Sequence, residues 1–289
     1  MDIRLFNTER NRHSITSLTA YNNLAQFKRA KRKNASYDEE ANTYKPTKKD
    51  RIRAILRKRL KIEAKTENQR LFMDAIKDPS VEFVIGSGIS GCGKSFLALV
   101  EALNLLQDDK NHYDEIMIFK SITPLKGEDI GALPGTVDEK LLFIYQSFFM
   151  QLEKLIPADE LKKLYDEKII KIMPLGTIRG ISISATTIVI IDEVQNLTSE
   201  KVHTAKTRMS EGAKMILIGD EKQCDTKVWE DNGLTYLVEC YSNVHPSIEV
   251  ITFNEDDSVR SPLIKMFQQT FDKYTAKLAK LDKESRKKQ

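Results

Sequence analysis

The chain has 289 residues, a formal net charge of +4 and a 40% share of hydrophobic residues. Its length fits one domain of about 200 residues with extensions, or two small domains, and its apolar share is enough for a core. It has no run of eighteen apolar residues and no apolar stretch near the N-terminus, so neither a membrane-spanning helix nor a secretory signal is expected. The cysteines Cys92, Cys224 and Cys240 lack CxxC spacing, which argues against a disulfide scaffold or zinc site and for a reducing, cytoplasmic compartment.

Charge is distributed unevenly along the chain. Residues 1–65 hold 18 Lys and Arg against 7 Asp and Glu, a net of +11, while residues 66–289 hold the remaining 28 and 35, a net of −7. A basic arm on an acidic core indicates a polyanion partner such as single-stranded nucleic acid, and a merely solvated extension is the alternative. Residues 1–50 contain few apolar side chains, so much of this stretch is expected to be disordered on its own.

Apolar periodicity predicts alternating strands and helices from residue 81 onward, preceded by one basic amphipathic helix. The expected strands cover residues 81–86, 115–120, 169–173, 186–192, 214–220 and 248–253. The expected helices cover residues 50–64, 94–107, 138–156, 199–211 and 259–281, with Thr198 as the N-cap of the fourth. This alternation predicts an α/β fold with a mostly parallel, doubly wound sheet. We divide the chain into a basic extension over 1–65, a core over 66–273 and a charged tail over 274–289.

A phosphate-binding motif follows the first expected strand. The pattern GxxxxGK[ST] is met in full, with a strand before it and a helix after it, as the motif requires. Its glycines allow backbone N–H groups to surround a phosphate, and the start of the helix favours the same anion. We expect Lys94 to neutralise the β- and γ-phosphates and Ser95 to hold magnesium through its hydroxyl. The expected nucleotide contacts here are Gly88, Ile89, Ser90, Gly91, Cys92, Gly93, Lys94, Ser95 and Phe96.

Two carboxylates end the apolar strand at 186–192. Asp192 is placed to hold magnesium, directly or through water, as in a Walker B element. Glu193 is placed to activate an attacking water as a general base. A pair of acids at a strand end can also form a solvated turn, but the phosphate loop in the same chain favours the catalytic interpretation.

Two further polar segments are less specific. Gly219–Gln223 (GDEKQ) follows a strand at the carboxyl edge of the sheet, where ligands of open α/β folds bind, so Asp220 and Gln223 are candidates to contact the γ-phosphate or the water. An ordinary polar turn is the alternative. Upstream, the Gln69 amide can both donate and accept, which matches an adenine edge, while Thr66 can cap a helix at the same place.

Six segments in a fixed order resemble the signatures of the PhoH family, ATPases close to the core of superfamily-1 helicases. The segments are Thr66–Ile76 (TENQRLFMDAI), Pro124–Gly135 (PLKGEDIGALPG), Pro174–Gly180 (PLGTIRG), Asp192–Asn196 (DEVQN), Gly219–Gln223 (GDEKQ) and Ser258–Leu263 (SVRSPL). Together they cover roughly residues 66–270. The resemblance implies a RecA-like P-loop fold that uses ATP and Mg²⁺. The compact core without a PIN-type nuclease domain is similar to phage-encoded members, which act in the host cytoplasm.

Two departures from the family pattern concern basic residues. The family often has T-R-P before its G-E segment, where this chain reads Lys120-Ser121-Ile122. An arginine role there must fall to Lys120 or be absent. The family's H-P is Ser261-Pro262 in this chain, so the histidine is not carried over.

The resemblance also implies roles for single residues. It makes Gln69 and Gln223 expected nucleotide contacts. It makes Arg260 a candidate arginine finger. The resemblance also suggests a ring of several copies, such as a hexamer, and in a ring Arg260 would act in trans. A surface salt bridge with Asp256 or Asp257 is the alternative for Arg260. Arg179 can face nucleic acid or phosphate, and the sequence does not choose between them.

Three functions are compatible with these motifs. The leading one is ATP hydrolysis coupled to single-stranded RNA, helicase-like if several copies assemble, because one RecA-like core cannot form a two-domain cleft. A nucleotide-gated adaptor with slow turnover is the second. A small-molecule kinase is the third, and it is disfavoured because arginines for a lid are sparse between residues 95 and 178.

Overall fold

The computed structural model describes residues 46–120, 137–224 and 231–286, which all belong to one compact unit. The expected disorder of the basic arm and the resemblance at Pro124–Gly135 lie outside the described residues. Within the described ranges, no helix is both long and apolar enough to cross a membrane.

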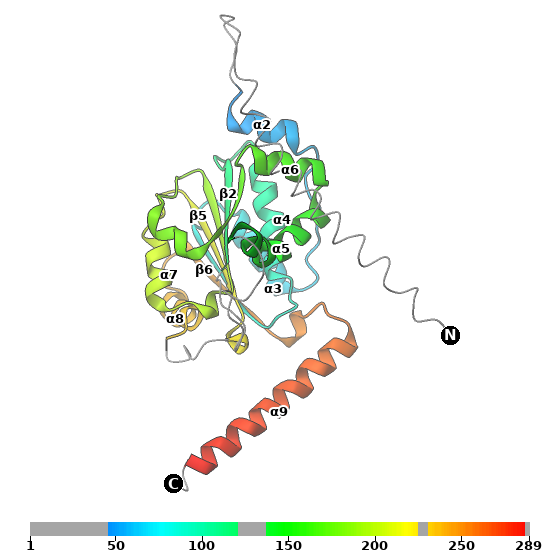
Figure 1. The fold of residues 1–289 in the computed structure, drawn as a ribbon, viewed down its shortest axis with the longest axis vertical. Helices are drawn as coiled ribbons and strands as arrows, with labels where there is room; N and C mark the ends of the chain where they lie inside the picture. Colours follow the sequence, from blue (N-terminus) through cyan, green and yellow to red (C-terminus); the bar gives the residue numbers. More distant parts are fainter. Residues whose placement is uncertain (1–45, 121–136, 225–230, 287–289) are drawn as a thin grey trace, which may run out of the picture. The chain divides into compact units, whose positions relative to one another are not determined.

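Six parallel strands form the central sheet (Figure 1). They are β1 (Phe83–Gly88), β2 (Glu115–Lys120), β3 (Ile170–Pro174), β4 (Thr187–Asp192), β5 (Lys214–Gly219) and β6 (Ile248–Phe253). Their order across the sheet is β3-β2-β4-β5-β1-β6, and every pairing is parallel. β5 therefore separates β1, which leads into the phosphate loop, from β4, which ends in Asp192. This is the RecA-like P-loop arrangement, and it confirms the expected fold class.

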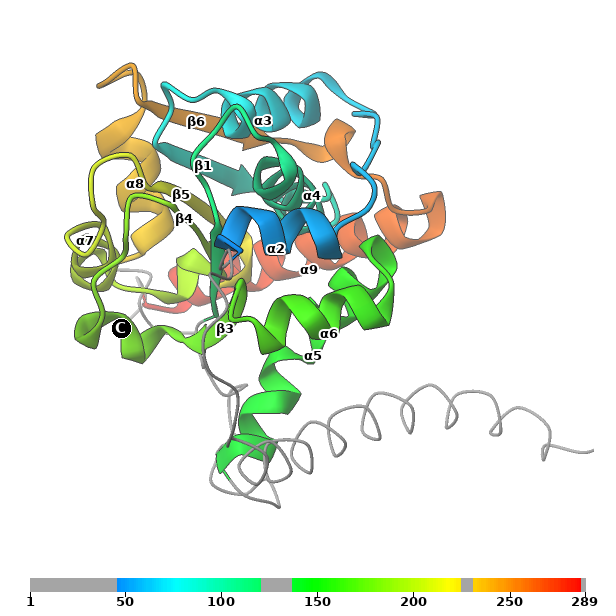
Figure 2. The same ribbon diagram turned by 90° about the horizontal axis from the view of Figure 1, so that it is seen from above.

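Helices cover both faces of the sheet. The α-helices are α2 (Lys48–Ile55), α3 (Glu67–Lys77), α4 (Lys94–Gln107), α5 (Val137–Leu155), α6 (Ala158–Asp166), α7 (Ser199–Lys206), α8 (Gly233–Tyr241) and α9 (Pro262–Arg286). Short 3-10 helices are η2 (Leu175–Gly180), η3 (Val194–Asn196), η4 (Glu221–Gln223) and η6 (Glu255–Asp257). Figure 2 shows α7 and α8 on one side of the sheet and α2, α4, α5 and α6 on the other.

The core consists of two apolar layers separated by the sheet. Alternate residues of a strand point to opposite faces, and β4 illustrates this. Ile188 and Ile190 are buried with α2 to α6, whereas Val189 and Ile191 are buried with α7, α8 and η2. β4 is therefore central and covered on both faces, as its continuous apolar run predicts.

The expected boundaries hold best where an apolar run ends abruptly. The helix over 94–107 and the strands over 115–120 and 248–253 are confirmed to the residue. Thr198 caps α7 as expected, since its side chain accepts a hydrogen bond from the Lys201 N–H. Thr66 caps α3 in the same way. α6 was not expected from the sequence.

The helix expected over 50–64 is wrong in its second half. α2 ends at Ile55, and residues 56–66 continue without regular structure. Asn104 of α4 binds this segment through both polar groups of Leu60, accepting from its N–H at 2.9 Å and donating to its carbonyl at 3.1 Å. Because these bonds satisfy the Leu60 backbone from a distant helix, the segment has no need of helical hydrogen bonds there.

The two expected domain boundaries, after residues 65 and 273, stay predictions. Buried residues before the first boundary belong to the core, and one helix continues across the second. Ile52, Ile55 and Leu56 precede residue 66 and are buried in the layer that contains α4. At the other end, α9 begins at Pro262, three residues later than expected, and continues through residue 273 to Arg286. α7 ends at Lys206 rather than at 211.

Candidate functional site

The phosphate loop connects β1 to α4 and contains three glycines with positive φ, Gly88, Gly91 and Gly93, the first two of which also lack space for a Cβ. Gly88 has φ +133°, and a Cβ there would lie 2.1 Å from the carbonyl oxygen of Phe253. Gly91 has φ +89°, and a Cβ there would overlap the side chain of Arg260. Residues with a Cβ are disfavoured at Gly88 and Gly91, because they avoid these φ angles and because neighbouring atoms occupy the space that a Cβ needs. The sequence therefore needs these glycines for local packing before any ligand is considered.

Lys94 lies at the start of α4 with its ammonium inside the loop. Its Nζ donates to the carbonyls of Gly88 and Ile89, at 2.7 Å each. The side chain is buried, and this burial lowers the pKa of Lys94, while Asp220 and Asp192 oppose the shift. The loop thus holds a cation at its centre by local bonds to its own backbone.

Ser95 and Asp192 connect α4 to the end of β4. The Ser95 Oγ donates to the Asp192 Oδ2 at 3.0 Å, and the Glu193 N–H donates to the other carboxylate oxygen at 2.9 Å. Burial raises the pKa of Asp192. A hydroxyl and a carboxylate are hard oxygen ligands, and Mg²⁺ commonly uses one or two such protein ligands with waters and phosphates. The two residues expected to hold the metal therefore lie together, and their chemistry fits it.

Glu193 has a backbone conformation that only glycine adopts readily. Its φ of 59° and ψ of 40° lie in the left-handed region. Such a conformation costs a non-glycine residue on the order of 1–2 kcal/mol and occurs preferentially at functional sites. The Glu193 carboxylate accepts a hydrogen bond of 2.7 Å from the Gln195 side chain. The carboxylate is therefore held in one direction.

Gln195 is a residue that the sequence analysis did not assign to the site. It is fully buried, and besides Glu193 its Nε2 donates to the Gln223 carbonyl at 3.3 Å. Its Oε1 accepts from the Asp220 N–H at 3.1 Å. A Cβ on Gly219 would lie 2.6 Å from the same Oε1. Gln195 therefore links the end of β4 to the end of β5, and the signal was present in the DEVQN segment as a polar residue two positions beyond the acid pair.

Asp220 lies between the loop and β5. Its Oδ2 accepts from the Ser90 N–H at 2.7 Å, and its Oδ1 accepts from the Lys222 N–H at 3.0 Å. The structure thus brings Asp220 to the phosphate loop. Gln223 differs, because its side chain is exposed and none of the hydrogen bonds among the described residues joins that side chain to the loop. Only its backbone carbonyl takes part, through Gln195.

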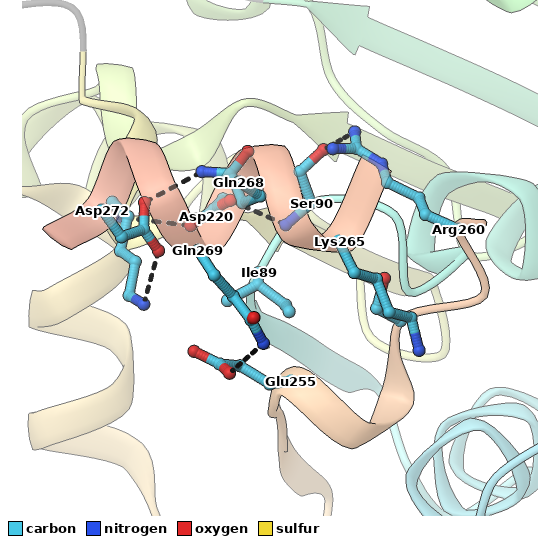
Figure 3. A pocket seen from close by; sticks show the side chains of 11 residues that line it. Ile89, Ser90, Asp220, Glu255, Arg260, Lys265, Gln268, Gln269 and Asp272 are labelled. Atoms are coloured by element: carbon cyan, nitrogen blue, oxygen red, sulfur yellow. Dashed lines mark hydrogen bonds and ion pairs between the residues drawn. The ribbon is translucent and has the colours of Figure 1, made fainter. Parts of the chain in front are cut away.

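Arg260 lies against the phosphate loop of its own chain. Its Nη2 donates to the Ser90 Oγ at 2.7 Å, and Figure 3 shows Ser90 between Arg260 and Asp220. The neighbouring Val259 N–H donates to the Gly91 carbonyl at 3.0 Å. The alternative of a salt bridge with Asp256 or Asp257 is wrong, since the described residues contain no such pair and Asp257 binds Asn68 instead.

Gln69 contacts the loop from the other side. Its Oε1 accepts from the Lys65 N–H at 2.7 Å, and its Nε2 donates to the Cys92 carbonyl at 2.9 Å. Both ends of the amide thus have protein partners, and the side chain is buried. Gln69 connects the segment before α3 to the phosphate loop in this structure.

The other expected contacts with the nucleotide belong to the loop itself or to the first turn of α4. Cys92 is fully buried, and the half-buried Ile89 and Phe96 pack against the apolar layer that contains α4. Arg179, on η2, is exposed and lies 3.6 Å from the Glu200 carboxylate.

A pocket beside the loop continues beneath α9 (Figure 3). It is lined by Ile89, Ser90, Asp220, Lys222, Glu255, Ser258, Arg260, Lys265, Gln268, Gln269 and Asp272.

Comparison with known proteins gives a consistent set of relatives. A PhoH-like protein of Bacillus subtilis (strain 168) is 32% identical over 212 residues, which is 73% of this chain and 64% of the relative. Protein PhoH2 of the same strain is 37% identical over 62% of this chain and 41% of the relative. The chain spans less than two thirds of the length of these curated relatives.

The solved structures that match are more distant. The large terminase of a thermophilic bacteriophage, in complex with ADP, is 15% identical, with a TM-score of 0.39 over 71% of this chain and 49% of the terminase. The Bacteroides Pif1 in complex with ADP-AlF4 is 13% identical, with a TM-score of 0.29 over 65% of this chain and 42% of Pif1.

A protein-family model described as PhoH-like protein matches residues 61–272. This range includes every residue of the site described above. Because the match covers well over half of the sequence, the chain belongs to the PhoH-like protein family.

Proposed function

We propose that the chain binds ATP with Mg²⁺ at the phosphate loop, hydrolyses it, and couples hydrolysis to single-stranded RNA. The observation that supports this most directly is the hydrogen bond of 3.0 Å between Ser95 and Asp192. It joins the start of α4 to the end of β4, so that a phosphate-binding loop and an acidic strand end form one site. Neither motif alone would support hydrolysis.

Each basic group of the site has a distinct task in this proposal. Lys94 exchanges its two loop carbonyls for phosphate oxygens, which is a local change because both carbonyls belong to the loop. Arg260 is held at Ser90 by one hydrogen bond and can turn toward the terminal phosphate from the same chain. A cation at that position stabilises charge on the transferred phosphoryl group. We therefore propose that Arg260 acts in cis.

Glu193 is the proposed general base. Gln195 orients its carboxylate, and the left-handed backbone at residue 193 turns it away from the strand direction. In this position it would take a proton from the attacking water. Bound Mg²⁺, held by Ser95 and Asp192, would supply charge neutralisation to the phosphates. Gln195 also contacts the backbone of Asp220 and Gln223, so a change at the terminal phosphate can reach Glu193 through a single side chain.

RNA binding is assigned to the basic N-terminal arm, which carries Lys28, Arg29, Lys31, Arg32 and Lys33 in one run. Such a run binds phosphates without reading sequence, and its affinity falls with salt. Strand displacement by this single core would require several copies, which we propose assemble with RNA. A nucleotide-gated adaptor with slow turnover is the competing function, and one assay separates the two.

The test is ATP turnover with and without single-stranded RNA, for the wild type, Glu193→Gln and the matched control Glu239→Gln. Glu239 is an exposed acid on α8, so its variant should keep wild-type turnover. Loss of the general base should lower turnover by on the order of 10²–10⁴-fold while ATP binding persists. Turnover that is the same in wild type and Glu193→Gln would reject Glu193 as the base. ATP binding without measurable wild-type turnover would support the adaptor.

A second assay examines the RNA assignment. Replacing the five basic residues of the run by Gln removes the charges that would neutralise up to five phosphates. The slope of log affinity for single-stranded RNA against log salt should then fall by about 0.7 for each phosphate that is no longer neutralised. Unchanged RNA affinity and slope would reject the arm as the RNA-binding surface, whatever the ATPase result.

A further inference from the structure

α9 has one strongly apolar face that no described part of the chain covers. Among the described residues, most of the exposed large hydrophobic side chains lie on this helix. They are Leu263, Ile264, Met266, Phe267, Phe271, Tyr274 and Leu278. Three of these are aromatic and keep about three fifths of their surface in solvent: Phe267 at 62%, Phe271 at 61% and Tyr274 at 59%. Isolated exposed apolar residues are normal, but a continuous stripe of them is not.

The opposite face of α9 is the one that contacts the core. Asp272 pairs with Lys222 at 3.4 Å, and Gln269 donates to the Glu255 carboxylate at 3.3 Å. These contacts are polar and lie beside the phosphate loop (Figure 3). In Figure 1, α9 is one continuous rod that leaves the sheet on the side where the strands end. The apolar face therefore points away from the core on which the helix rests.

The stripe has the spacing of a coiled-coil seam. Its central residues, Ile264, Phe267, Phe271, Tyr274 and Leu278, follow one another at intervals of three, four, three and four. This is the a/d pattern by which two helices pack side by side with knobs in holes. Gln268, Thr270 and Thr275 flank the seam, so two identical helices would not bring like charges together along most of its length. We propose that α9 is a docking surface for the α9 helix of a second copy of this chain.

The apolar area is consistent with such a pair. An aromatic side chain buries roughly 150–250 Å², so the three rings at their observed exposure offer on the order of 350 Å². Ile264, Leu278 and Leu263 raise the total to about 500–600 Å² per helix, the upper end for any patch on a typical monomer. A standard interface buries about 800 Å² per partner, of which about 65% is apolar in homodimers. The exposed apolar area of α9 therefore matches the apolar area that a standard homodimer interface buries on each partner.

Pairing through α9 gives two copies of the chain a specific contact surface, and it requires neither RNA binding nor ATP hydrolysis. A two-fold pair of α9 helices uses the same surface on both copies and closes after two. The cores are held to α9 through its polar face, so pairing leaves the contacts of Asp272 and Gln269 in place. The phosphate loop of each copy would then lie beside the helix that joins it to its partner.

The experiment is the mass of the full chain by light scattering, without nucleotide or RNA, over a range of concentrations. The wild type should form a dimer. The double variant Phe267→Glu/Phe271→Glu should be monomeric at the same concentrations, because it puts four charges into the seam. Val244→Glu places the same charge on an exposed apolar residue outside α9 and should remain dimeric. Circular dichroism should be the same for all three, since the changed side chains are exposed.

Disulfide trapping identifies the surface directly. Phe271 is the middle residue of the five, so a two-fold axis through the seam brings its two copies together in either helix orientation. In a Cys240→Ser background, which removes the exposed thiol, Phe271→Cys should form a covalent dimer under mild oxidation, and Val244→Cys should not.

Other outcomes would overturn the proposal. A wild type that is monomeric at all concentrations rejects α9 pairing, even if ATP turnover is normal. A dimer that survives the double variant assigns self-association to a different surface. A monomer that binds vesicles of anionic lipid through α9 assigns the stripe to a membrane surface instead. Because none of these masses depends on turnover, failure here leaves the ATPase proposal untouched.

Discussion

Two buried lysines lie at opposite edges of the sheet and make nearly the same contacts. At the carboxyl edge, Lys94 donates to the carbonyls of Gly88 and Ile89. At the amino edge, Lys214 begins β5 and donates to the carbonyls of Asp78 and Val81. Burial lowers the pKa of both, that of Lys214 to about 8. By burial and bonding alone, either could be taken for the functional lysine.

The difference lies in which carbonyls each lysine binds. Lys94 binds residues only five and six positions before it, so its bonds close a local loop. Lys214 binds residues more than 130 positions before it, so its bonds join β5 to the turn after α3. A lysine that exchanges local bonds for a ligand leaves the fold intact, whereas one that joins distant segments cannot do so. For these two lysines, sequence separation therefore distinguishes the ligand-ready charge, Lys94, from the structural charge, Lys214.

The largest expected effect is that of Lys94→Met. Removing one preorganised cation from the phosphates should lower ATP turnover by on the order of 10²–10³-fold. The free energy of unfolding should change by less than about 1 kcal/mol, because the two freed carbonyls are in a half-exposed loop. Turnover and urea unfolding of the same preparation check both parts. A variant that loses stability but keeps turnover would reverse the assignment of the two lysines.

Lys214→Met should show the opposite pattern. Turnover per folded molecule should stay at the wild-type level, while the free energy of unfolding falls by about 1–3 kcal/mol through the unpaired carbonyls.

The pH dependence of this loss has a definite sign. The folded pKa of Lys214, about 8, lies below the ordinary 10.5, so the unfolded chain binds more protons between these values. The free energy of unfolding of the wild type should therefore rise as the pH rises from 8 to 10.5. This gain should be lost again as the pH falls back toward 8. Between pH 8 and pH 10 the gap to Lys214→Met should widen by up to roughly 2 kcal/mol. A constant gap, measured by urea unfolding, would contradict the low pKa.

Of the substitutions at Lys94, Lys214 and Gln195, the one at Gln195 should have the smallest effect. Among the described residues, the amino edge of the sheet has no buried amide that plays the same part. Gln195→Ala removes the hydrogen bond that orients Glu193, and kcat should fall about tenfold with KM for ATP nearly unchanged. Asn104→Ala is the matched control, because that buried amide binds Leu60 and not the site. Its stability should fall while kcat stays constant. Equal loss of kcat in both variants would mean that Gln195 acts only through stability.

Sequence reasoning predicted the site best where the chemistry is local. The phosphate loop, Asp192 and Asp220 come together as expected, because parallel strands bring their carboxyl ends to one edge. The helix over 94–107 was predicted to the residue, since its apolar pattern begins and ends within the same element.

Predictions failed where distant residues supply the partner. The segment after Ile55 has helical apolar spacing, yet Asn104 holds the backbone of Leu60 and the helix ends early. The salt bridge considered as the alternative for Arg260 also fails, because Arg260 binds Ser90, which is 170 positions away. Gln195 is part of the DEVQN segment, but its contacts with Asp220 and Gln223 depend on β5 lying beside β4. Single-sequence patterns carry no information on such pairs.

The left-handed backbone of Glu193 has a consequence for how this protein can change. Glycine, and to a lesser degree asparagine, would relieve the strain at this position, so either replacement is expected to make the folded state more stable. Under the proposed mechanism, the same replacement would remove the general base. Screening variants for heat resistance alone would therefore enrich inactive proteins at residue 193, and retention of Glu there would indicate selection for turnover at a cost in stability.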